Sequence, residues 1–272
     1  MERALATRPL PPYRALLAVD IVRFSRTRGV FLGDLREQVP VVLERAMNLS
    51  GLQDAWDARR FPDSAGDDYI FGTDPASLPF LIWPLLGNLQ TVLEEVDHQL
   101  AARDRDLRLR LRAALHVGPV PDSGDPVRDR ISEPTVTTFR LLSSEPINEA
   151  LKRSHPDVTQ TAAVLSQRVY DDVIRPGYTP MHPSEFTPVT AEVPGKDFAE
   201  PAWLYVPRPS WQAEPPDRPV DSPAPTTEEK AGGPRVVFNA PVGQSNTAQQ
   251  MQVNQTLPPD FFSSAPGGNQ GE

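Results

Sequence analysis

The chain has 272 residues, no cysteine and a formal net charge of −9. The absence of cysteine excludes disulfides, thiolate zinc sites and cysteine nucleophiles, and it fits a reducing compartment. The negative charge argues against a general nucleic-acid binder, because binding of phosphate groups along a polymer needs a basic face. A single nucleotide remains compatible with this charge, since a bound metal ion can supply the local positive charge.

The distribution of apolar residues along the sequence does not indicate a membrane protein. Residues Met1–Pro12 carry charge and proline without a long apolar core, which is not the pattern of a secretory signal. The most apolar stretch, Leu78–Leu93, contains two prolines and ends at Glu94, so it is too short and too interrupted to span a bilayer. We therefore expect a cytoplasmic protein that binds neither membrane nor nucleic acid.

The first hundred residues predict alternating strands and helices. Tyr13–Val22 is a nearly continuous apolar run, which is typical of a central strand buried on both faces. Asp34 is expected to cap a helix, because Glu37 completes a capping-box spacing. The remaining expected elements are a strand at Ala55–Phe61, a hairpin that turns at Gly66 and Asp67, a strand at Tyr69–Phe71 and one long helix over Leu78–Ala102.

The same alternation continues to residue 207. Leu107–Val117 predicts a strand, and Thr135–Arg153 a helix that Pro146 divides into two shorter ones. This order predicts an α/β (α+β) fold, a mixed and mostly antiparallel sheet flanked by helices. The later expected elements are a strand at Thr161–Leu165, a short helix at Gln167–Ile174 and closing strands at Phe186–Val193 and Ala202–Val206.

The composition changes abruptly after the last expected strand. Residues 208–234 are rich in proline, acid and small polar side chains, which is typical of a disordered linker. We therefore predict a folded domain at 13–207, a linker at 208–234, an interaction motif at 235–256 and a disordered tail at 257–272.

Three sequence stretches resemble the class III adenylyl/guanylyl cyclase family, in particular its divergent bacterial members. They are LLAVDIVRFSR, GDDYIFG and LRAALHVGPV, and they appear in the family's order. TVTTFRLL and GKDFAEPAWLYVP resemble a later helix and the closing strands of the family. The resemblance covers roughly residues 13–207 and implies a ferredoxin-like cyclase fold.

The resemblance also implies a site. Asp20 and Asp67 would be the carboxylates that hold two Mg²⁺ or Mn²⁺ ions, with the Ile21 carbonyl as a further ligand. Arg140 would be the catalytic residue that stabilises charge on the α-phosphate. The backbone N–H groups of Val22, Arg23, Phe24 and Ser25 would cradle the phosphates of a nucleoside triphosphate.

Each of these residues also has a plainer interpretation. Asp20 can cap the turn after its strand, and Asp67 can act in turn formation beside Gly66. Arg140 can be a surface arginine in an ion pair. His116, in the stretch LRAALHVGPV, is interpreted as a hydrogen-bonded histidine of the core rather than a catalytic one.

The sequence departs from the family at the nucleoside-binding positions. Val136 stands where the family has an asparagine that orients the ribose, and Asp63 occupies the base-selecting position where purine cyclases have lysine. The family's site forms between two protomers, so a homodimer is implied. The first hypothesis is a metal-dependent cyclase that forms a 3′,5′-cyclic nucleotide, and the second is a catalytically degenerate cyclase-like protein that signals or scaffolds through its C-terminal motif. A third, a purely structural domain, predicts that Asp20→Ala and Asp67→Ala leave nucleotide affinity unchanged.

The uncharged stretch VVFNAPVGQSNTAQQMQV, at 236–253, mixes β-branched residues with Asn and Gln. This composition favours cross-β stacking, and it resembles the short amyloid signalling motifs that recruit a protein partner through a like motif. The alternative is a polar disordered tail that happens to contain apolar residues.

Overall fold

The central strand of the structure is β1 (Tyr13–Ile21), whose residues from Ala15 to Ile21 are all buried. β1 pairs in antiparallel fashion with β3 (Asp68–Thr73) on one side and with β4 (Leu111–Pro119) on the other. A strand with neighbours on both edges and helices on both faces has no position for exposed polar side chains, which explains its nearly continuous apolar sequence.

The computed structural model describes residues 7–22, 29–63, 67–104, 107–125, 129 and 131–210. All of these fall within one unit, Met1–Asp217. The predicted interaction motif at 235–256 and the tail at 257–272 lie outside the described residues, as does all of the predicted linker except its first three residues.

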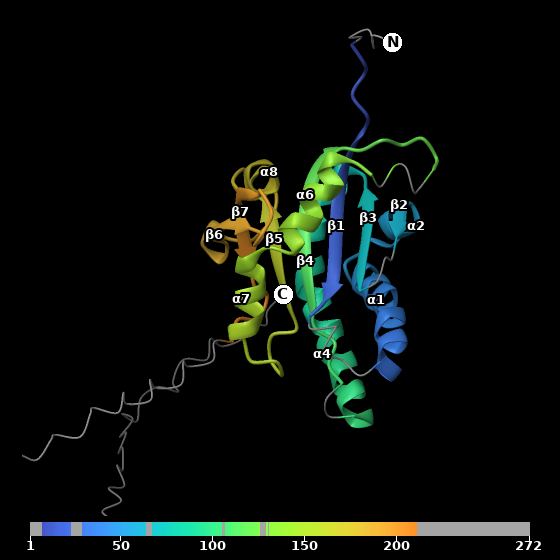
Figure 1. Cartoon of the computed structure of the whole chain (residues 1–272), viewed down its shortest axis with the longest axis vertical. Coiled ribbons are helices and arrows are strands. Elements are labelled where there is room, and N and C mark those ends of the chain that lie inside the picture. The colour runs from blue at the N-terminus through green and yellow to red at the C-terminus, as the bar shows by residue number, and fades with distance from the viewer. Residues whose placement is uncertain are drawn as a thin grey trace, which may run out of the picture. The chain divides into compact units, whose positions relative to one another are not determined.

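Seven strands form one sheet in the order β2-β3-β1-β4-β5-β7-β6 (Figure 1). Every neighbouring pair is antiparallel except β4 and β5, which are parallel. The predicted class, a mixed and mostly antiparallel sheet flanked by helices, is confirmed. The remaining strands are β2 (Arg60–Asp63), β5 (Thr161–Ser166), β6 (Thr187–Glu192) and β7 (Ala199–Tyr205).

The first four strands have a ferredoxin-like arrangement. In chain order they read β1, α1, β2, β3, α4, β4, and the order in the sheet is β2-β3-β1-β4. This is the β-α-β-β-α-β motif, in which each helix crosses one face of the sheet to the next strand. The arrangement places the end of β1 beside the start of β3.

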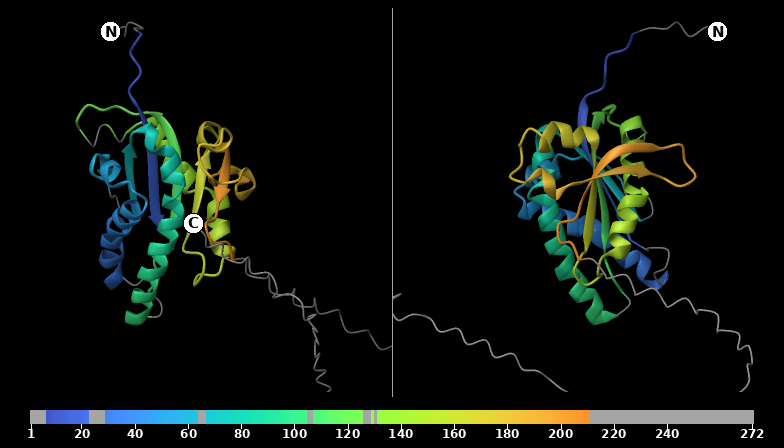
Figure 2. Two further views of the ribbon diagram at one scale, coloured as in Figure 1. Left: turned by 180° about the vertical axis from the view of Figure 1, so that it is seen from behind. Right: turned by 90° about the vertical axis from the view of Figure 1, so that its left-hand side faces the viewer.

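Helices cover the two faces of the sheet with separate cores (Figures 1 and 2). On one face, α1 (Gly29–Leu49) and α4 (Leu85–Arg103) pack on apolar side chains such as Leu17 and Leu115. On the other face, α6 (Glu133–Leu142) and α7 (Glu145–Arg153) pack on Ala18, Ala114 and Val164. The short elements are α2 (Gln53–Asp57), η2 (Pro75–Ser77), α3 (Leu78–Ile82), α8 (Gln167–Val169), the π-turn η3 (Tyr170–Ile174) and η4 (Pro183–Glu185).

Three predicted boundaries are wrong for identifiable reasons. α1 begins at Gly29, so Asp34 lies inside the helix and does not cap it. Residues 53–57 form helix α2 rather than a strand, and the long helix expected over Leu78–Ala102 is interrupted at Trp83 and Pro84. Pro84 has no N–H to donate, and the two segments meet at an angle of 52°.

Other predicted boundaries are confirmed. α6 and α7 are separate helices, with Pro146 in the first turn of α7, where its missing N–H does no harm. Ser132 caps α6 by accepting a hydrogen bond from the Thr135 N–H.

Among the described residues no single helix has the length and apolarity to cross a bilayer, although the bent pair Pro75–Ile82 and Leu85–Arg103 meets that requirement jointly.

The pairing of β2 with β3 depends on a close contact between Phe61 and Gly72. Phe61 has a φ of 38°, a left-handed conformation that is unusual for a bulky residue. Its ring lies over Gly72, so that a Cβ atom at position 72 would be 2.4 Å from Phe61 Cζ. The ring packs with Leu16 and Val120 in a small core of its own.

We expect Gly72→Ala to destabilise the fold by about 1–3 kcal/mol, because the added methyl group displaces the Phe61 ring. The matched control is Gly33→Ala in α1, where a new Cβ meets nothing within 4 Å. That change should stabilise the helix by up to about 1 kcal/mol. Urea unfolding followed by circular dichroism measures both, and equal effects of the two substitutions would contradict the contact.

Candidate functional site

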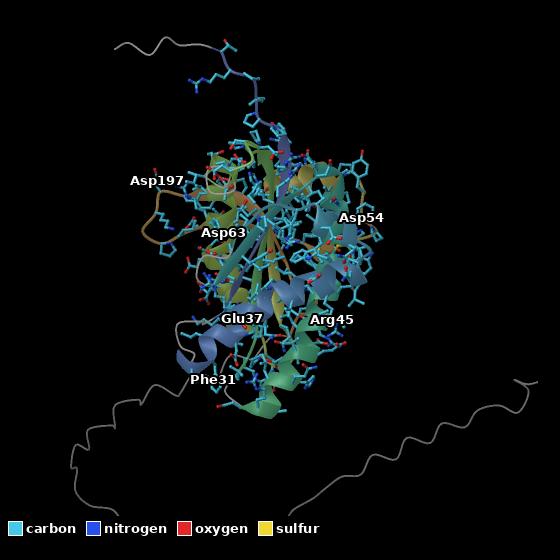
Figure 3. All side chains as sticks on the ribbon, turned by 90° about the vertical axis from the view of Figure 1, so that its right-hand side faces the viewer. Phe31, Glu37, Arg45, Asp54, Asp63 and Asp197 are labelled. Atoms are coloured by element: carbon cyan, nitrogen blue, oxygen red, sulfur yellow. The ribbon has the colours of Figure 1, made fainter. Side chains whose placement is uncertain are left out.

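Asp20 and Asp67 lie at the same end of the sheet. The β1–β3 register pairs Asp20 with Asp68, and the Ile21 N–H donates a hydrogen bond to the Asp67 carbonyl oxygen at 3.2 Å. Asp63 is on β2, where it pairs with Ile70 of β3 (Figure 3). Four carboxyl-bearing residues from three neighbouring strands and one turn therefore gather at this end.

Arg112 of β4 holds the carboxylate of Asp20 with two hydrogen bonds. The antiparallel register places the two residues opposite each other. Arg112 Nε donates to Asp20 Oδ1 at 2.6 Å, and Nη2 donates to Oδ2. The side chain of Arg112 is 18% exposed and that of Asp20 is 10% exposed, so this bidentate ion pair is largely removed from water.

Asn148 of α7 fixes the guanidinium from the other side. Arg112 Nη1 donates to Asn148 Oδ1, while Asn148 Nδ2 donates to the carbonyl oxygens of Ser143 (3.2 Å) and Ser144 (2.9 Å). Because carbonyl oxygens only accept hydrogen bonds, the atom of Asn148 that faces them must be the amide nitrogen. The amide oxygen therefore faces Arg112. The position of Asp20 is thus set by a chain of contacts that reaches α7.

Burial raises the pKa of Asp20 to about 6. Arg112 opposes this increase by its charge and its hydrogen bonds, whereas the negative charges of Asp67 and Asp68 add to it. The mutual effect of these carboxylates fits their gathering at one end of the sheet. A cation placed among them would relieve their repulsion.

The donor atoms at this end suit a hard divalent cation. A carboxylate has about four lone-pair positions, of which Arg112 uses two on Asp20. The positions that remain, together with the Asp67 carboxylate and the Ile21 carbonyl, are oxygen ligands of the kind that Mg²⁺ and Mn²⁺ prefer. Within the described part of the chain no cluster of three or more His, Cys, Asp or Glu side chains is arranged to hold a metal ion. A cation here would therefore complete its shell with water and substrate phosphates, as Mg²⁺ commonly does.

The predicted phosphate cradle is corrected at its first residue. The Val22 N–H donates to the Arg110 carbonyl oxygen at 2.9 Å, so this group is already used in the pairing of β1 with β4. Arg23, Phe24 and Ser25 lie outside the described residues.

Among the described residues Arg140 forms no ion pair with Asp20, whose partner is Arg112. Arg140 lies on α6, and its guanidinium carbon is 5.4 Å from the ring centre of Phe198, just before β7. The β6–β7 hairpin to which it points extends from the sheet (Figure 2). Asp197 marks its turn in Figure 3. Val136, one turn earlier on α6, is 44% exposed.

Sequence reasoning missed Arg112 and Asn148. A signal for Arg112 was present, because Leu and Arg alternate from Leu107 to Arg112 and alternation assigns the arginines to one face of a strand. Asn148 had no such signal, since its role depends on where α7 packs.

His116 also differs from its interpretation as a satisfied core histidine. Its Nδ1 atom is buried without a hydrogen-bond partner among the described residues. Burial, together with the charge of Arg168, lowers the pKa of His116 to about 4. The imidazole is therefore neutral at pH 7.

Comparison with known proteins gives matches among solved structures only, since no family model and no curated protein matches the chain. The adenylyl cyclase CyaB from P. aeruginosa is 13% identical, over 71% of this chain and 93% of that one, with a TM-score of 0.47. A bacterial light-regulated adenylyl cyclase is 12% identical, over 77% and 56% of the two chains, with a TM-score of 0.49. The catalytic core of a rhodopsin-guanylyl cyclase in complex with ATPαS is 15% identical, over 72% and 96%, with a TM-score of 0.40. At these values we conclude nothing about function from the matches.

We expect Asp20→Asn to destabilise the fold by about 3 kcal/mol, because it leaves the buried charge of Arg112 without its counterion. The double variant Asp20→Asn/Arg112→Met should cost clearly less than the sum of the two single changes. Urea unfolding of the wild type, the two single variants and the double variant measures the coupling.

The control is Asp34→Asn, which removes the partner of Arg103 in an exposed ion pair. The Arg103 side chain is 61% exposed and that of Asp34 is 49% exposed, so this change should alter stability by less than about 1 kcal/mol. Additive effects within the buried pair would contradict its role.

We expect the contribution of His116 to the stability of the fold to decrease as the pH falls from about 6.5 toward 4, whereas Asp20, whose pKa is raised to about 6, contributes in the opposite direction. Over this window the unfolded chain binds a proton at His116 that the folded chain, with its lowered pKa, does not bind. Compared with the wild-type protein, His116→Gln should therefore raise the urea midpoints at pH 5.5 and 4.5 relative to the midpoint at pH 7. An unchanged pH dependence in the variant would show that His116 titrates alike in both states.

Proposed function

We propose that residues 13–207 are a class III cyclase-type domain that converts a nucleoside triphosphate into a 3′,5′-cyclic nucleotide with two Mg²⁺ or Mn²⁺ ions. The observation that carries this proposal is the placement of Asp20 and Asp67 at one end of a ferredoxin-like sheet, with Asp20 held in place by Arg112. The order of the motifs along the sequence supports the same assignment.

In this reaction the 3′-oxygen of the ribose forms a bond to the α-phosphorus, and the bond from that phosphorus to the pyrophosphate oxygen breaks. Bound metal ions would neutralise the triphosphate and lower the pKa of the attacking hydroxyl. Asp20 and Asp67 would hold the ions, and Arg112 would keep the Asp20 carboxylate in a fixed orientation. Asn148 would keep Arg112 in that orientation in turn.

The resemblance to the cyclase family implies a homodimer. Arg140 lies beside Phe198 on the hairpin side of α6, and Lys196 is exposed on the same hairpin. In a homodimer of the kind that the family forms, these cations would face the Asp20 end of the second copy. Each composite site would then take acids from one protomer and Arg140 from its partner.

Two observations favour the degenerate cyclase-like signalling protein as the second candidate. The exposed Val136 side chain cannot donate a hydrogen bond to a ribose, and the Val22 N–H is already engaged by Arg110. Under this proposal the domain binds a nucleotide or only dimerises. Its output is then recruitment of a protein partner through residues 235–256.

We expect the full-length protein to form cyclic product from one of ATP, GTP, CTP and UTP, each tested with Mg²⁺ and with Mn²⁺. Asp67→Ala should lower turnover about a hundredfold or more, since losing a metal ligand removes several kcal/mol of transition-state stabilisation. Asp34→Asn, an exposed carboxylate on α1, is the matched control and should retain wild-type turnover. Mass spectrometry of the nucleotide products measures all of these.

The composite site has its own test. Asp67→Ala and Arg140→Ala proteins, each inactive alone, should regain about a quarter of wild-type activity when mixed, because a twofold heterodimer contains one intact site. Failure to regain activity with dimers present would contradict the shared site. Absence of product from all four nucleotides, with a folded dimer, would favour the signalling protein instead.

A further inference from the structure

A pocket opens at the end of the sheet opposite Asp20. It has a volume of about 530 Å³ and lies where the two parallel strands β4 and β5 both end. Ligands commonly bind outside the carboxyl ends of parallel strands, because the loops diverge there. The lining side chains used below are His116, Gln167, Arg168, Asp171, Asp172 and Glu200.

This pocket is separate from the candidate metal site. On β4, His116 is opposite Leu16 of β1, whereas Arg112 is opposite Asp20. The two positions are four residues apart on the strand, which corresponds to roughly 13 Å along the sheet. A ligand in the pocket therefore does not contact the carboxylates of the metal site.

Most charges that line the pocket are compensated within the protein. Arg168 Nε lies 3.6 Å from Asp172 Oδ2, and the Arg168 guanidinium carbon is 4.9 Å from the ring centre of Tyr13. Asp171 pairs with Arg175 at 2.7 Å and accepts a hydrogen bond from Gln167. The side chains that remain are those of Glu200 and His116.

Glu200 has no ion-pair or hydrogen-bond partner within the part of the chain that the structure describes. His116 adds no positive charge at pH 7, because its imidazole is neutral. The pocket thus carries one uncompensated negative charge beside a polar ring whose Nδ1 has no partner there. An anionic ligand would meet repulsion from Glu200, whereas an ammonium group would find an acceptor.

We propose that this pocket binds a small organic cation, a protonated amine whose N–H groups donate to Glu200. The volume suits a ligand with an aliphatic body in addition to its ammonium group. The aliphatic part would lie against Pro201, which also lines the pocket.

The test uses the full-length protein and three probes: n-butylamine, putrescine and spermidine hydrochlorides. Sodium chloride at equal ionic strength is the reference. We expect at least one amine to raise the melting temperature and to bind by calorimetry with a defined stoichiometry of one per chain. Glu200→Gln should weaken that binding about tenfold or more, since a hydrogen bond to a charged group is lost.

Glu192→Gln is the matched control, because Glu192 is exposed on β6 of the same hairpin and does not line the pocket. It should bind the amine as the wild type does, and so should Asp67→Ala, whether or not that variant turns over nucleotides. Equal weakening by Glu200→Gln and Glu192→Gln would overturn the site. No stabilisation by any of the three amines, or stabilisation by sodium acetate instead, would overturn it as well.

Discussion

The ion pair between Asp20 and Arg112 connects the layers of this domain at the point where its chemistry is expected. Asp20 lies one residue before the end of β1, whose residues from Ala15 onward are all buried, and an isolated carboxylate there would be protonated rather than charged. Arg112 supplies the counterion across one strand pair, and Asn148 extends the contact to the helix layer. The candidate ligand therefore depends on packing of α7, which is distant from it in sequence.

The sequence contained enough information for the class of fold and for most of its strands. Strands such as β1 and β5 are mostly apolar, so their burial is encoded locally. The errors arose where tertiary packing overrides local signals. Asp34 and Glu37 have the spacing of a helix start, yet Gly29–Gly33 continue the helix upstream because Phe31 packs against the core. Helix α2 places Trp56 against Tyr69 and Phe71. A single aromatic residue in a five-residue segment does not predict a helix, because the contact that stabilises it is formed with a later strand.

The candidate site was predictable only in part. Asp20 and Asp67 could be singled out because they stand at strand ends in motifs with a known order. The partner of Asp20 could not, because it is defined by the antiparallel register of two strands that are 92 residues apart. Arg140 illustrates the opposite case: its helix was predicted correctly, but the surface it faces became clear only from the β6–β7 hairpin.

The alternation of Leu and Arg from Leu107 to Arg112, which runs into the start of β4, bears on the register of the central strands. A slip of β4 by one residue would turn the leucines to the wrong face, and a slip by two would leave Asp20 opposite Arg110 or Ala114. Arg110 is committed elsewhere, to the carbonyls of Thr159 and Leu151, and Ala114 offers no charge. The pair Asp20–Arg112 thus forms only in the observed register of β1 and β4. A domain of this architecture would retain Asp20 for that reason even after losing turnover, so the presence of this aspartate alone is not a record of selection for catalysis.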